Sequence, residues 1–458
     1  MPINIPARIL APLALLAGLG GCVQTLGPPA PATSSVVVGE VSAADPRAQE
    51  AGLAMLRQGG NATDAAIATM LALTVVEPQS SGIGGGGFFV RGTASGEIAS
   101  LDGRETAPAG AFPEWFLNPD GTLPSFETSQ ASGLSVGVPG NVALAWKAHE
   151  RYGKLPWAAL FQPAITLARD GFVVNAQLFD SLTANHALAA ASASGRAWLH
   201  GGDGRPLPVG TRVTNPALAD TFVAIAAEGP QAFYAGARAQ AIAGTVAAAT
   251  PRPRPMTVAD IASYTAKERS PVCGSYRGYR ICGMGPPSSG GIAVLGILGM
   301  LERFDLKGLG VANPVTWHLF LEAQRLAYAD RELYAADSDF VSVPVRGLAD
   351  PAYLAERSRL IASDRSLGVV TPGRPAGAAV ALADGDEPPE QGTSHFAAVD
   401  GAGTMVSYTS TIESAFGSGL MANGFYLNNE LTDFSRKPTG ADGKPVANRV
   451  EAGKRPRS

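Results

Sequence analysis

The sequence changes character abruptly at a single peptide bond, the one between Gly392 and Thr393. Residues 383–392 are acidic and rich in proline, which is typical of an exposed loop. Residues 393–400 then alternate in polarity and predict a half-buried strand, and Thr404–Thr411 predict a second strand after a glycine-containing turn. An exposed loop that leads directly into a core hairpin places Thr393 at the first position of a rigid strand.

Thr393 is therefore a candidate catalytic nucleophile. A threonine hydroxyl group is weakly nucleophilic unless a base lies beside it, and the α-amine of an N-terminal threonine can be that base. Such an amine has a pKa near 8, which suits proton transfer at neutral pH. This chemistry requires cleavage of the Gly392–Thr393 bond, and glycine tolerates the strained backbone that cleavage favours. Many threonines begin strands without such a role, so the pattern by itself leaves a purely structural threonine as the alternative.

The N-terminal part of the chain predicts two helices. Pro46–Arg57 has helical periodicity and is followed by a glycine pair that ends it. Asn61, with Asp64 three residues later, predicts a capping box for an almost wholly apolar helix over Ala62–Val75. The glycine-rich stretch 84–87 lacks the Lys-Ser/Thr ending of a phosphate-binding loop, so nucleotide binding is not expected.

The first residues resemble a bacterial lipoprotein leader. Arg8 precedes the apolar stretch Ile9–Leu19, which is short for a membrane span, and small residues then lead to Cys22. We expect a lipoprotein signal peptide over residues 1–21, a lipid-modified Cys22, and a Pro-, Thr- and Ser-rich tether over residues 22–35. These features predict a membrane-anchored lipoprotein of the bacterial periplasm. A plain signal peptide with an incidental cysteine is the alternative.

Two further cysteines, Cys273 and Cys282, predict a disulfide bond. If Arg277-Gly278 forms a two-residue hairpin turn, the two cysteines lie opposite each other on neighbouring strands. Export to an oxidising compartment favours the bond over the alternative of two buried thiols. The five histidines show no ligand spacing, so no metal site is expected. The net charge of -4 argues against a nucleic-acid partner.

Three segments around the candidate nucleophile resemble the start of the small subunit in the γ-glutamyltransferase family: Thr393–Phe396, Tyr408–Gly417 and Leu427–Phe434. Further motifs match that family in its own order, and the match covers roughly residues 36–458. They are Gly59–Ala66, Gly84–Phe88, Asp102–Pro108, Gly137–Gly140, Pro286–Gly291, Ala327–Arg331 and Gly453–Pro456.

The resemblance implies a fold and a reaction. The implied fold is the α/β, four-layer αββα sandwich of the N-terminal-nucleophile hydrolases, with a large subunit over residues 36–392 and a small subunit over residues 393–458. The implied activity is autoprocessed γ-glutamyl transfer and glutathione hydrolysis, through a γ-glutamyl ester on the nucleophile and with no cofactor. Its implied partners are glutathione or other γ-glutamyl compounds, amino acid or peptide acceptors, and the two subunits of one precursor.

The resemblance also implies individual roles. Thr393 would be both the cleavage residue, after Gly392, and the nucleophile, while Thr411 would hydrogen bond its amine. Arg104 would bind the substrate α-carboxylate, as a planar bidentate donor can. Ser458 would assist it as the first of a serine pair. The α-ammonium group would lie against carboxylates on the other side of the pocket, supported by Asn428 or Asn429; these acids are Glu413, Glu430 and Asp433. Taken singly, Arg104 and an acid could equally be an ordinary surface ion pair.

The sequence departs from the family after Ser458, where we expect a second serine and a Gly-Gly pair whose amides form an oxyanion hole. We interpret the chain as truncated at its C-terminus and expect its own activity to suffer, because one lost oxyanion donor typically costs about a hundredfold or more in rate. Two alternatives remain open. One is a related acylase for glutaryl β-lactam or γ-polyglutamate substrates, and the other is an inactive protein that binds γ-glutamyl compounds.

Overall fold

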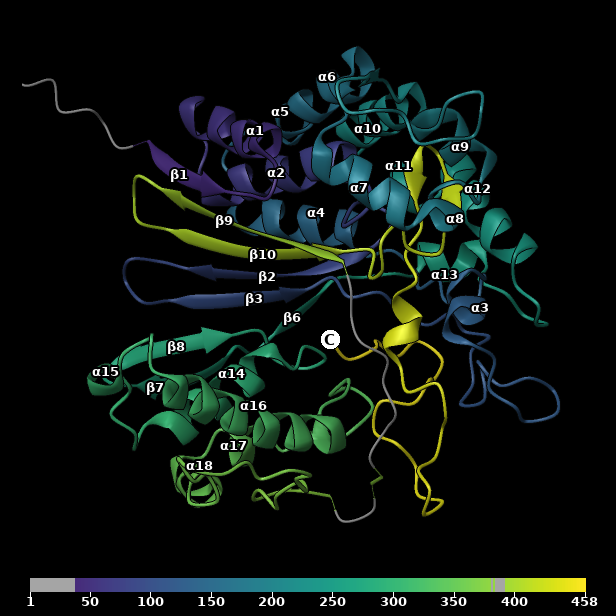
Figure 1. Ribbon diagram of the computed structural model, residues 1–458. Helices are drawn as coiled ribbons and strands as arrows, with labels where there is room; N and C mark the ends of the chain where they lie inside the picture. The colour runs from purple at the N-terminus through teal and green to yellow at the C-terminus, as the bar shows by residue number, and fades with distance from the viewer. Residues whose placement is uncertain (1–37, 380–381, 384–391) are drawn as a thin grey trace, which may run out of the picture. The chain divides into compact units, whose positions relative to one another are not determined.

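The computed structural model describes residues 38–379, 382–383 and 392–458 (Figure 1). The predicted signal peptide, Cys22 and the tether lie outside the described residues, as does most of the acidic loop before Gly392. Among the helices that are described, none is both long and apolar enough to cross a membrane.

The centre of the fold is a six-stranded antiparallel sheet with the strand order β1-β9-β10-β2-β3-β6. The predicted hairpin forms its middle, and its register places Thr393 opposite Thr411. Alternate residues of the hairpin are buried, which is why the polarity alternates in the sequence. The strands are β1 (Gly39–Ser42), β2 (Gly86–Gly92), β3 (Ile98–Asp102), β6 (Lys267–Arg269), β9 (Thr393–Asp400) and β10 (Met405–Thr411).

Helices cover one face of this sheet (Figure 1). Helix α2 (Ala62–Val76) packs against β9 and β10 and is buried along its whole length, which explains its continuous apolar sequence. Asn61 and Asp64 form the predicted capping box at its first turn. The other elements of this part are α1 (Pro46–Arg57), α4 (Asn141–Tyr152), α5 (Trp157–Leu160), α6 (Gln162–Asp170), β4 (Phe172–Val173), α7 (Ala176–Ala184), α8 (His186–Ala189), α9 (Ala193–Leu199), β5 (Arg212–Val213), α10 (Pro216–Glu228), α11 (Gln231–Tyr234), α12 (Gly236–Ala248) and α13 (Val258–Ala262).

A hairpin and a second group of helices lie on the other side of the sheet, which gives the layer order of the αββα class (Figure 1). The hairpin turns at Arg277-Gly278, where both residues have positive φ, and Cys273 and Cys282 are disulfide-bonded across it. It packs against α14. These elements are β7 (Val272–Tyr276), β8 (Tyr279–Gly283), α14 (Gly290–Leu301), α15 (Leu306–Leu309), α16 (Pro314–Tyr334), α17 (Val345–Leu348) and α18 (Pro351–Ser358).

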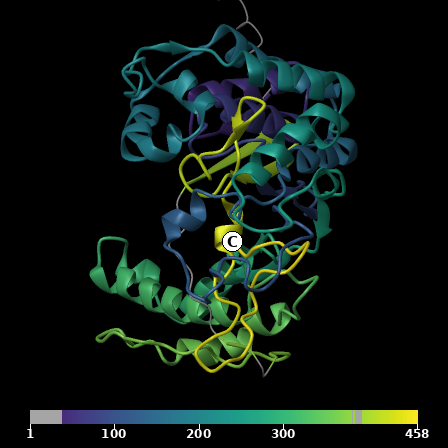
Figure 2. The same cartoon turned by 90° about the vertical axis from the view of Figure 1, so that its right-hand side faces the viewer.

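The last part of the chain returns between these two groups of helices, as both views show (Figures 1 and 2). A buried ion pair holds Arg455 in place, because Arg455 Nη1 lies 2.6 Å from Asp102 Oδ2. The same oxygen lies 3.0 Å from Arg269 Nε. The remaining elements are α3 (Phe126–Gln130), β11 (Met421–Ala422), β12 (Phe425–Tyr426) and the 3-10 helix η1 (Glu430–Asp433).

The glycine-rich stretch at the start of β2 is required because neighbouring segments approach its backbone too closely for a side chain. A Cβ atom at Gly85 would lie 2.0 Å from the carbonyl oxygen of Thr411, and one at Gly86 would lie 2.4 Å from the carboxyl group of Glu105. Neither contact is possible for a larger residue. The glycines thus let β2 approach the nucleophile hairpin, which accounts for them without a phosphate ligand.

Candidate functional site

The hydroxyl groups of Thr393 and Thr411 form the centre of the site. Thr393 Oγ1 donates a hydrogen bond of 3.2 Å to Thr411 Oγ1, which in turn donates to the carbonyl oxygen of Gly392 at 3.1 Å. The backbone N–H of Glu413 also donates to Thr411 Oγ1, at 2.7 Å. The Thr411 hydroxyl group thus links the candidate nucleophile with the carbonyl group of the predicted cleavage bond.

Gly392 has a backbone conformation that favours glycine, with φ of 95°. A Cβ atom at this position would lie 2.7 Å from the carbonyl oxygen of Glu413. Both facts exclude an unstrained side chain immediately before Thr393. The backbone at the predicted cleavage bond is therefore fixed in an uncommon geometry, as the sequence analysis anticipated for a glycine here.

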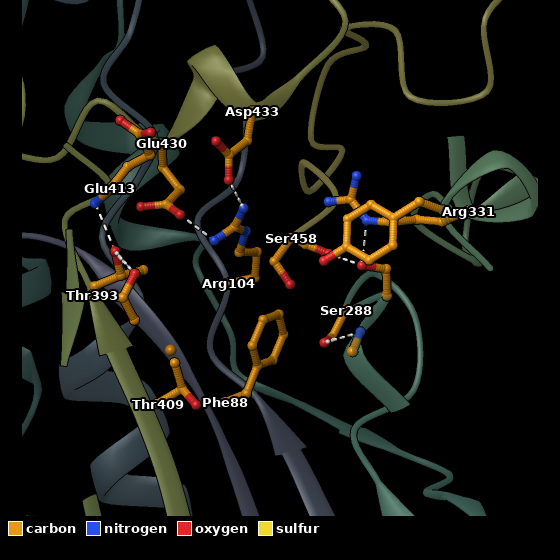
Figure 3. Close-up of a pocket in the computed structure, with 15 residues that line it drawn as sticks. Phe88, Arg104, Ser288, Arg331, Thr393, Thr409, Glu413, Glu430, Asp433 and Ser458 are labelled. Carbon is orange, nitrogen blue, oxygen red and sulfur yellow. Dashed lines mark hydrogen bonds and ion pairs between the residues drawn. The ribbon is translucent and has the colours of Figure 1, made fainter. Parts of the chain in front are cut away.

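Arg104 follows β3 and is almost completely buried. Asp102 positions it, because Asp102 Oδ1 accepts the backbone N–H of Arg104 at 2.8 Å. The guanidinium group forms ion pairs with Glu430 through Nη1 and with Asp433 through Nη2, and both acids lie on η1 (Figure 3). It also donates to the carbonyl oxygens of Pro456 at 3.1 Å and Arg457 at 2.9 Å.

This geometry differs from the expected pocket in one respect. We expected Arg104 on one side of the pocket and the carboxylates on the other, whereas Arg104 is in direct contact with Glu430 and Asp433. The physical reason is that a buried guanidinium group must be paired with opposite charge. The pairs are also not the surface ion pairs of the alternative interpretation, because all three side chains are buried.

Glu413 lies beside Thr411, to whose hydroxyl group its backbone N–H donates. Its backbone has a positive φ of 71°, and its carboxylate accepts hydrogen bonds from Ser414 Oγ and Asn429 Nδ2. Burial raises the pKa of this carboxyl group to about 7, although both hydrogen bonds oppose the shift. Glu413 can therefore change its protonation state near neutral pH.

The two candidate asparagines hold the acids in place by different contacts. Asn429 Oδ1 accepts the backbone N–H of Ser414 at 3.0 Å, so Asn429 binds both the backbone and the side chains of the Glu413 loop. Asn428 Oδ1 accepts the N–H of Glu430 at 3.0 Å and that of Gly137 at 2.9 Å. Each asparagine thus supports one acid, Asn429 supporting Glu413 and Asn428 supporting Glu430.

These residues line one cavity of about 280 Å³ (Figure 3). Ser458 lies at its edge, where its carbonyl oxygen accepts hydrogen bonds from the N–H of Ser289 at 3.1 Å and from Ser289 Oγ. Of the residues predicted for the substrate site, the two asparagines, Asn428 and Asn429, are not among those that line the cavity, and both support the acids that do. The others are Arg104, Thr393, Thr411, Glu413, Glu430, Asp433 and Ser458.

Several other residues of the cavity wall had no role predicted from the sequence. Helix α16 contributes Tyr328 and Arg331, and Arg331 Nε donates to Ser289 Oγ at 2.7 Å. Both belong to the motif Ala327–Arg331, and Ser288 and Ser289 belong to Pro286–Gly291, so these motifs were the available signal. Phe88 and Thr409 likewise belong to the motifs Gly84–Phe88 and Tyr408–Gly417.

The site contains no evident metal ligand set. Within the part of the chain that the structure describes, no group of three or more His, Cys, Asp and Glu side chains could hold a metal ion. The arrangement instead offers a hydroxyl nucleophile beside an arginine and three acids, which fits an acyl group that carries a zwitterionic end.

Comparisons with known proteins agree with this geometry. The family described as gamma-glutamyltranspeptidase matches residues 48–458. A glutathione hydrolase proenzyme of Escherichia coli is 37% identical over 98% of this chain and 78% of its own length. The crystal structure of Helicobacter pylori gamma-glutamyltranspeptidase is 36% identical, with a TM-score of 0.69 over 73% of this chain and 95% of that one. A cephalosporin acylase from Bacillus halodurans is 29% identical, with a TM-score of 0.77 over 91% of this chain and 73% of that one.

Proposed function

The chain belongs to the γ-glutamyltranspeptidase family, and we propose that it is an autoprocessed γ-glutamyltransferase and glutathione hydrolase whose nucleophile is Thr393. The Escherichia coli relative is a proenzyme, which supports a precursor that matures into two subunits. The proposed division is after Gly392, so that residues 36–392 form the large subunit and Thr393 begins the small one.

Self-cleavage would begin with attack of Thr393 Oγ1 on the carbonyl carbon of Gly392. The Thr411 hydroxyl group, 3.1 Å from the Gly392 oxygen, can stabilise the negative charge that develops there. Breaking the C–N bond converts the amide into an ester and gives the Thr393 nitrogen a proton. Water then hydrolyses the ester, which releases the Gly392 carboxylate and regenerates the Thr393 hydroxyl group with a free α-amine.

Turnover would use the same hydroxyl group and the new amine. The α-amine removes the proton as Thr393 Oγ1 attacks the γ-carbonyl carbon of the substrate, and the proton passes to the leaving amine. The γ-glutamyl ester that remains is resolved by water, which gives glutamate, or by the amino group of an acceptor amino acid or peptide. Arg104 would bind the α-carboxylate, while Glu413, Glu430 and Asp433 would bind the α-ammonium group.

One observation carries this proposal: the hydroxyl group of Thr393 opens into the same cavity as Arg104 and the three acids. The test compares the release of an anilide leaving group from γ-glutamyl and glutaryl anilides, which differ only in the α-ammonium group. We expect the γ-glutamyl compound to react faster. A chain that stays uncut and binds glutathione in calorimetry without forming product would instead support the inactive binding protein.

The similarity to a cephalosporin acylase keeps a second function in view. A glutaryl side chain has no ammonium group, so a site for it has no use for a set of buried acids. Here three acids line the cavity, and two of them pair with Arg104. This favours the γ-glutamyl substrate, and faster cleavage of the glutaryl anilide would establish the acylase.

We also propose that the protein is anchored to a bacterial membrane through a lipid on Cys22 and faces the periplasm. The support is the leader sequence alone, an apolar stretch followed by small residues and a cysteine. Radiolabelled palmitate should enter the wild-type protein and not the Cys22→Ser variant, with both recovered from the producing cells. Label in the variant, or wild-type protein free in the periplasmic fraction, would contradict the anchor.

A further inference from the structure

Glu105 is a buried acid without an assigned role. Its side chain has no exposed surface, and among the described residues neither of its carboxyl oxygens accepts a hydrogen bond. The surroundings are tight: a Cβ atom at Gly86 would lie 2.4 Å from one of these oxygens, and a Cβ atom at Gly137 would lie 2.6 Å from the Cβ of Glu105. A buried carboxylate that accepts no hydrogen bond is strongly disfavoured, whereas a protonated carboxylic acid is neutral.

Burial and one nearby negative charge favour the protonated form of Glu105. The charge of Asp433 raises the pKa of Glu105, whereas Arg104, the backbone N–H of Glu105 itself and the neighbouring Glu430 carboxyl group lower it. The guanidinium group of Arg104 is held in ion pairs with Glu430 and Asp433. Burial is the largest effect and raises the pKa of Glu105 to about 8.

Two buried tyrosines complete these surroundings, and neither donates to Glu105. The hydroxyl group of Tyr264 donates to the carbonyl oxygen of Arg104 at 2.7 Å, and that of Tyr234 donates to the carbonyl oxygen of Pro139 at 2.9 Å. The side chain that lies within hydrogen-bonding reach of Glu105 is instead Glu430. Two carboxyl groups can share a hydrogen bond only if one of them holds a proton.

We propose that Glu105 is a protonated carboxylic acid at neutral pH that donates its O–H to the Glu430 carboxylate. Glu105 is then a positioning residue, because it touches no substrate and acts through Glu430. One oxygen of Glu430 is held by Arg104 and the carboxylate is fixed from a second direction by Glu105, in the orientation that receives the substrate α-ammonium group. This last step rests on the proposed function, whereas the shared proton does not.

Two substitutions distinguish a Glu105 that donates a hydrogen bond from a Glu105 that only fills space in the core. Glu105→Gln retains an N–H donor in nearly the same shape, while Glu105→Leu keeps a similar volume without a donor. We expect Glu105→Leu to raise KM about tenfold to a hundredfold, as loss of a hydrogen bond to a charged group does, with a smaller effect on kcat. Glu105→Gln should stay within about fivefold of wild type in KM.

Glu322 provides a matched control, since it is a buried acid that the structure holds ionised. Its carboxylate accepts hydrogen bonds from Ser366 Oγ and from the N–H of Leu367, both at 2.8 Å, and its pKa is lowered, hydrogen bonds and Arg325 outweighing burial. Glu322→Gln should lower the melting temperature and leave KM unchanged. Glu105→Gln should lower the melting temperature less than Glu322→Gln does, because glutamine at position 105 replaces a neutral acid.

Infrared spectroscopy tests whether Glu105 is protonated, and it does so without any measurement of enzyme activity. The difference between wild type and Glu105→Gln at neutral pH should contain the carbonyl band of one protonated carboxylic acid. The band should disappear at alkaline pH and in Glu430→Gln, whose amide can donate to an ionised Glu105. Absence of the band, or a Glu105→Gln variant that folds and is as impaired in KM as Glu105→Leu, would overturn the proposal. Wild-type protein that shows the band and turns over no γ-glutamyl compound would overturn the proposed function instead.

Discussion

The hydroxyl group of Thr411 lies 3.2 Å from that of Thr393, directly across two neighbouring strands. Because it also donates to the Gly392 carbonyl oxygen, it contacts both the hydroxyl group that would attack and the carbonyl group that would be attacked when the chain is cut. In the cut enzyme the same hydroxyl group would lie beside the new α-amine. One side chain would thus serve self-cleavage first and turnover afterwards.

Gly392→Ala should slow self-cleavage at least about tenfold, because alanine is strained at φ of 95° and its Cβ would lie 2.7 Å from the Glu413 carbonyl oxygen. The control is Gly443→Ala, at a position with φ of 75° and nothing within 4 Å of the added Cβ. It introduces backbone strain without a clash at the junction. Gel electrophoresis over time follows cleavage, and equal rates for the two variants would contradict the role of Gly392.

Arg104→Lys should raise KM for a γ-glutamyl substrate by about tenfold to a hundredfold, because lysine keeps the charge and loses the planar pair of donors. We expect a smaller change in kcat, since Arg104 binds the part of the substrate that does not react. Steady-state kinetics measures both. A variant with unchanged KM would remove Arg104 from the substrate site.

Glu413→Gln should raise KM increasingly as the pH rises. In wild type, burial raises the pKa of Glu413 to about 7, so the carboxylate that attracts the α-ammonium group forms above that pH. The ratio of mutant to wild-type KM should therefore be small in acid and grow through neutral pH. A ratio that does not change with pH would show that Glu413 carries no charge in the complex.

The same shift predicts an effect on stability. The folded chain holds the Glu413 proton more tightly than the unfolded chain does, so this group favours folding most at pH values below its ordinary pKa of 4.5. Its contribution is lost as the pH rises to about 7. Glu413→Gln should remove that part of the pH dependence of unfolding measured in urea.

Replacing both Cys273 and Cys282 by serine should lower the free energy of unfolding by about 2–3 kcal/mol, as the entropy of a short closed loop predicts. The disulfide closes the hairpin that packs against α14. Urea denaturation with and without reductant measures the change. Reductant should destabilise wild type and leave the double variant unaffected, and equal sensitivity of the two proteins would place the bond outside the native state.

Local features of the fold could be predicted from the sequence. Helix α2, its capping box at Asn61, and the hairpin of β9 and β10 depend on neighbouring residues, and the structure places them within one or two residues of the prediction. The hairpin of Cys273 and Cys282 is local in the same sense. Periodicity and turn chemistry are sufficient for such elements, because the interactions that form them lie close together in the chain.

The assembly of the site could not be derived in this way. Arg104 and Glu430 are 326 positions apart in the sequence, and only resemblance to a family related them in advance. Even then the ion pairs of Arg104 with Glu430 and Asp433 were not predicted. The roles implied by the family describe contacts with the substrate and not the contacts that these residues make with one another. Glu105 lies within the motif Asp102–Pro108, but the motif assigned it no role, because its significance depends on its burial among residues that are distant in the sequence.

We infer above all that the chain cuts itself before Thr393 and acts through that residue. Intact mass and N-terminal sequencing of the purified protein test it most directly, with Thr393→Ala beside wild type. We predict that wild type yields a fragment beginning Thr-Ser-His-Phe and a γ-glutamyl adduct on that fragment after mixing with substrate, whereas Thr393→Ala stays whole and inactive. A wild-type protein that turns over γ-glutamyl substrate as a single uncut chain, or that is cut elsewhere, would show that Thr393 does not have this role.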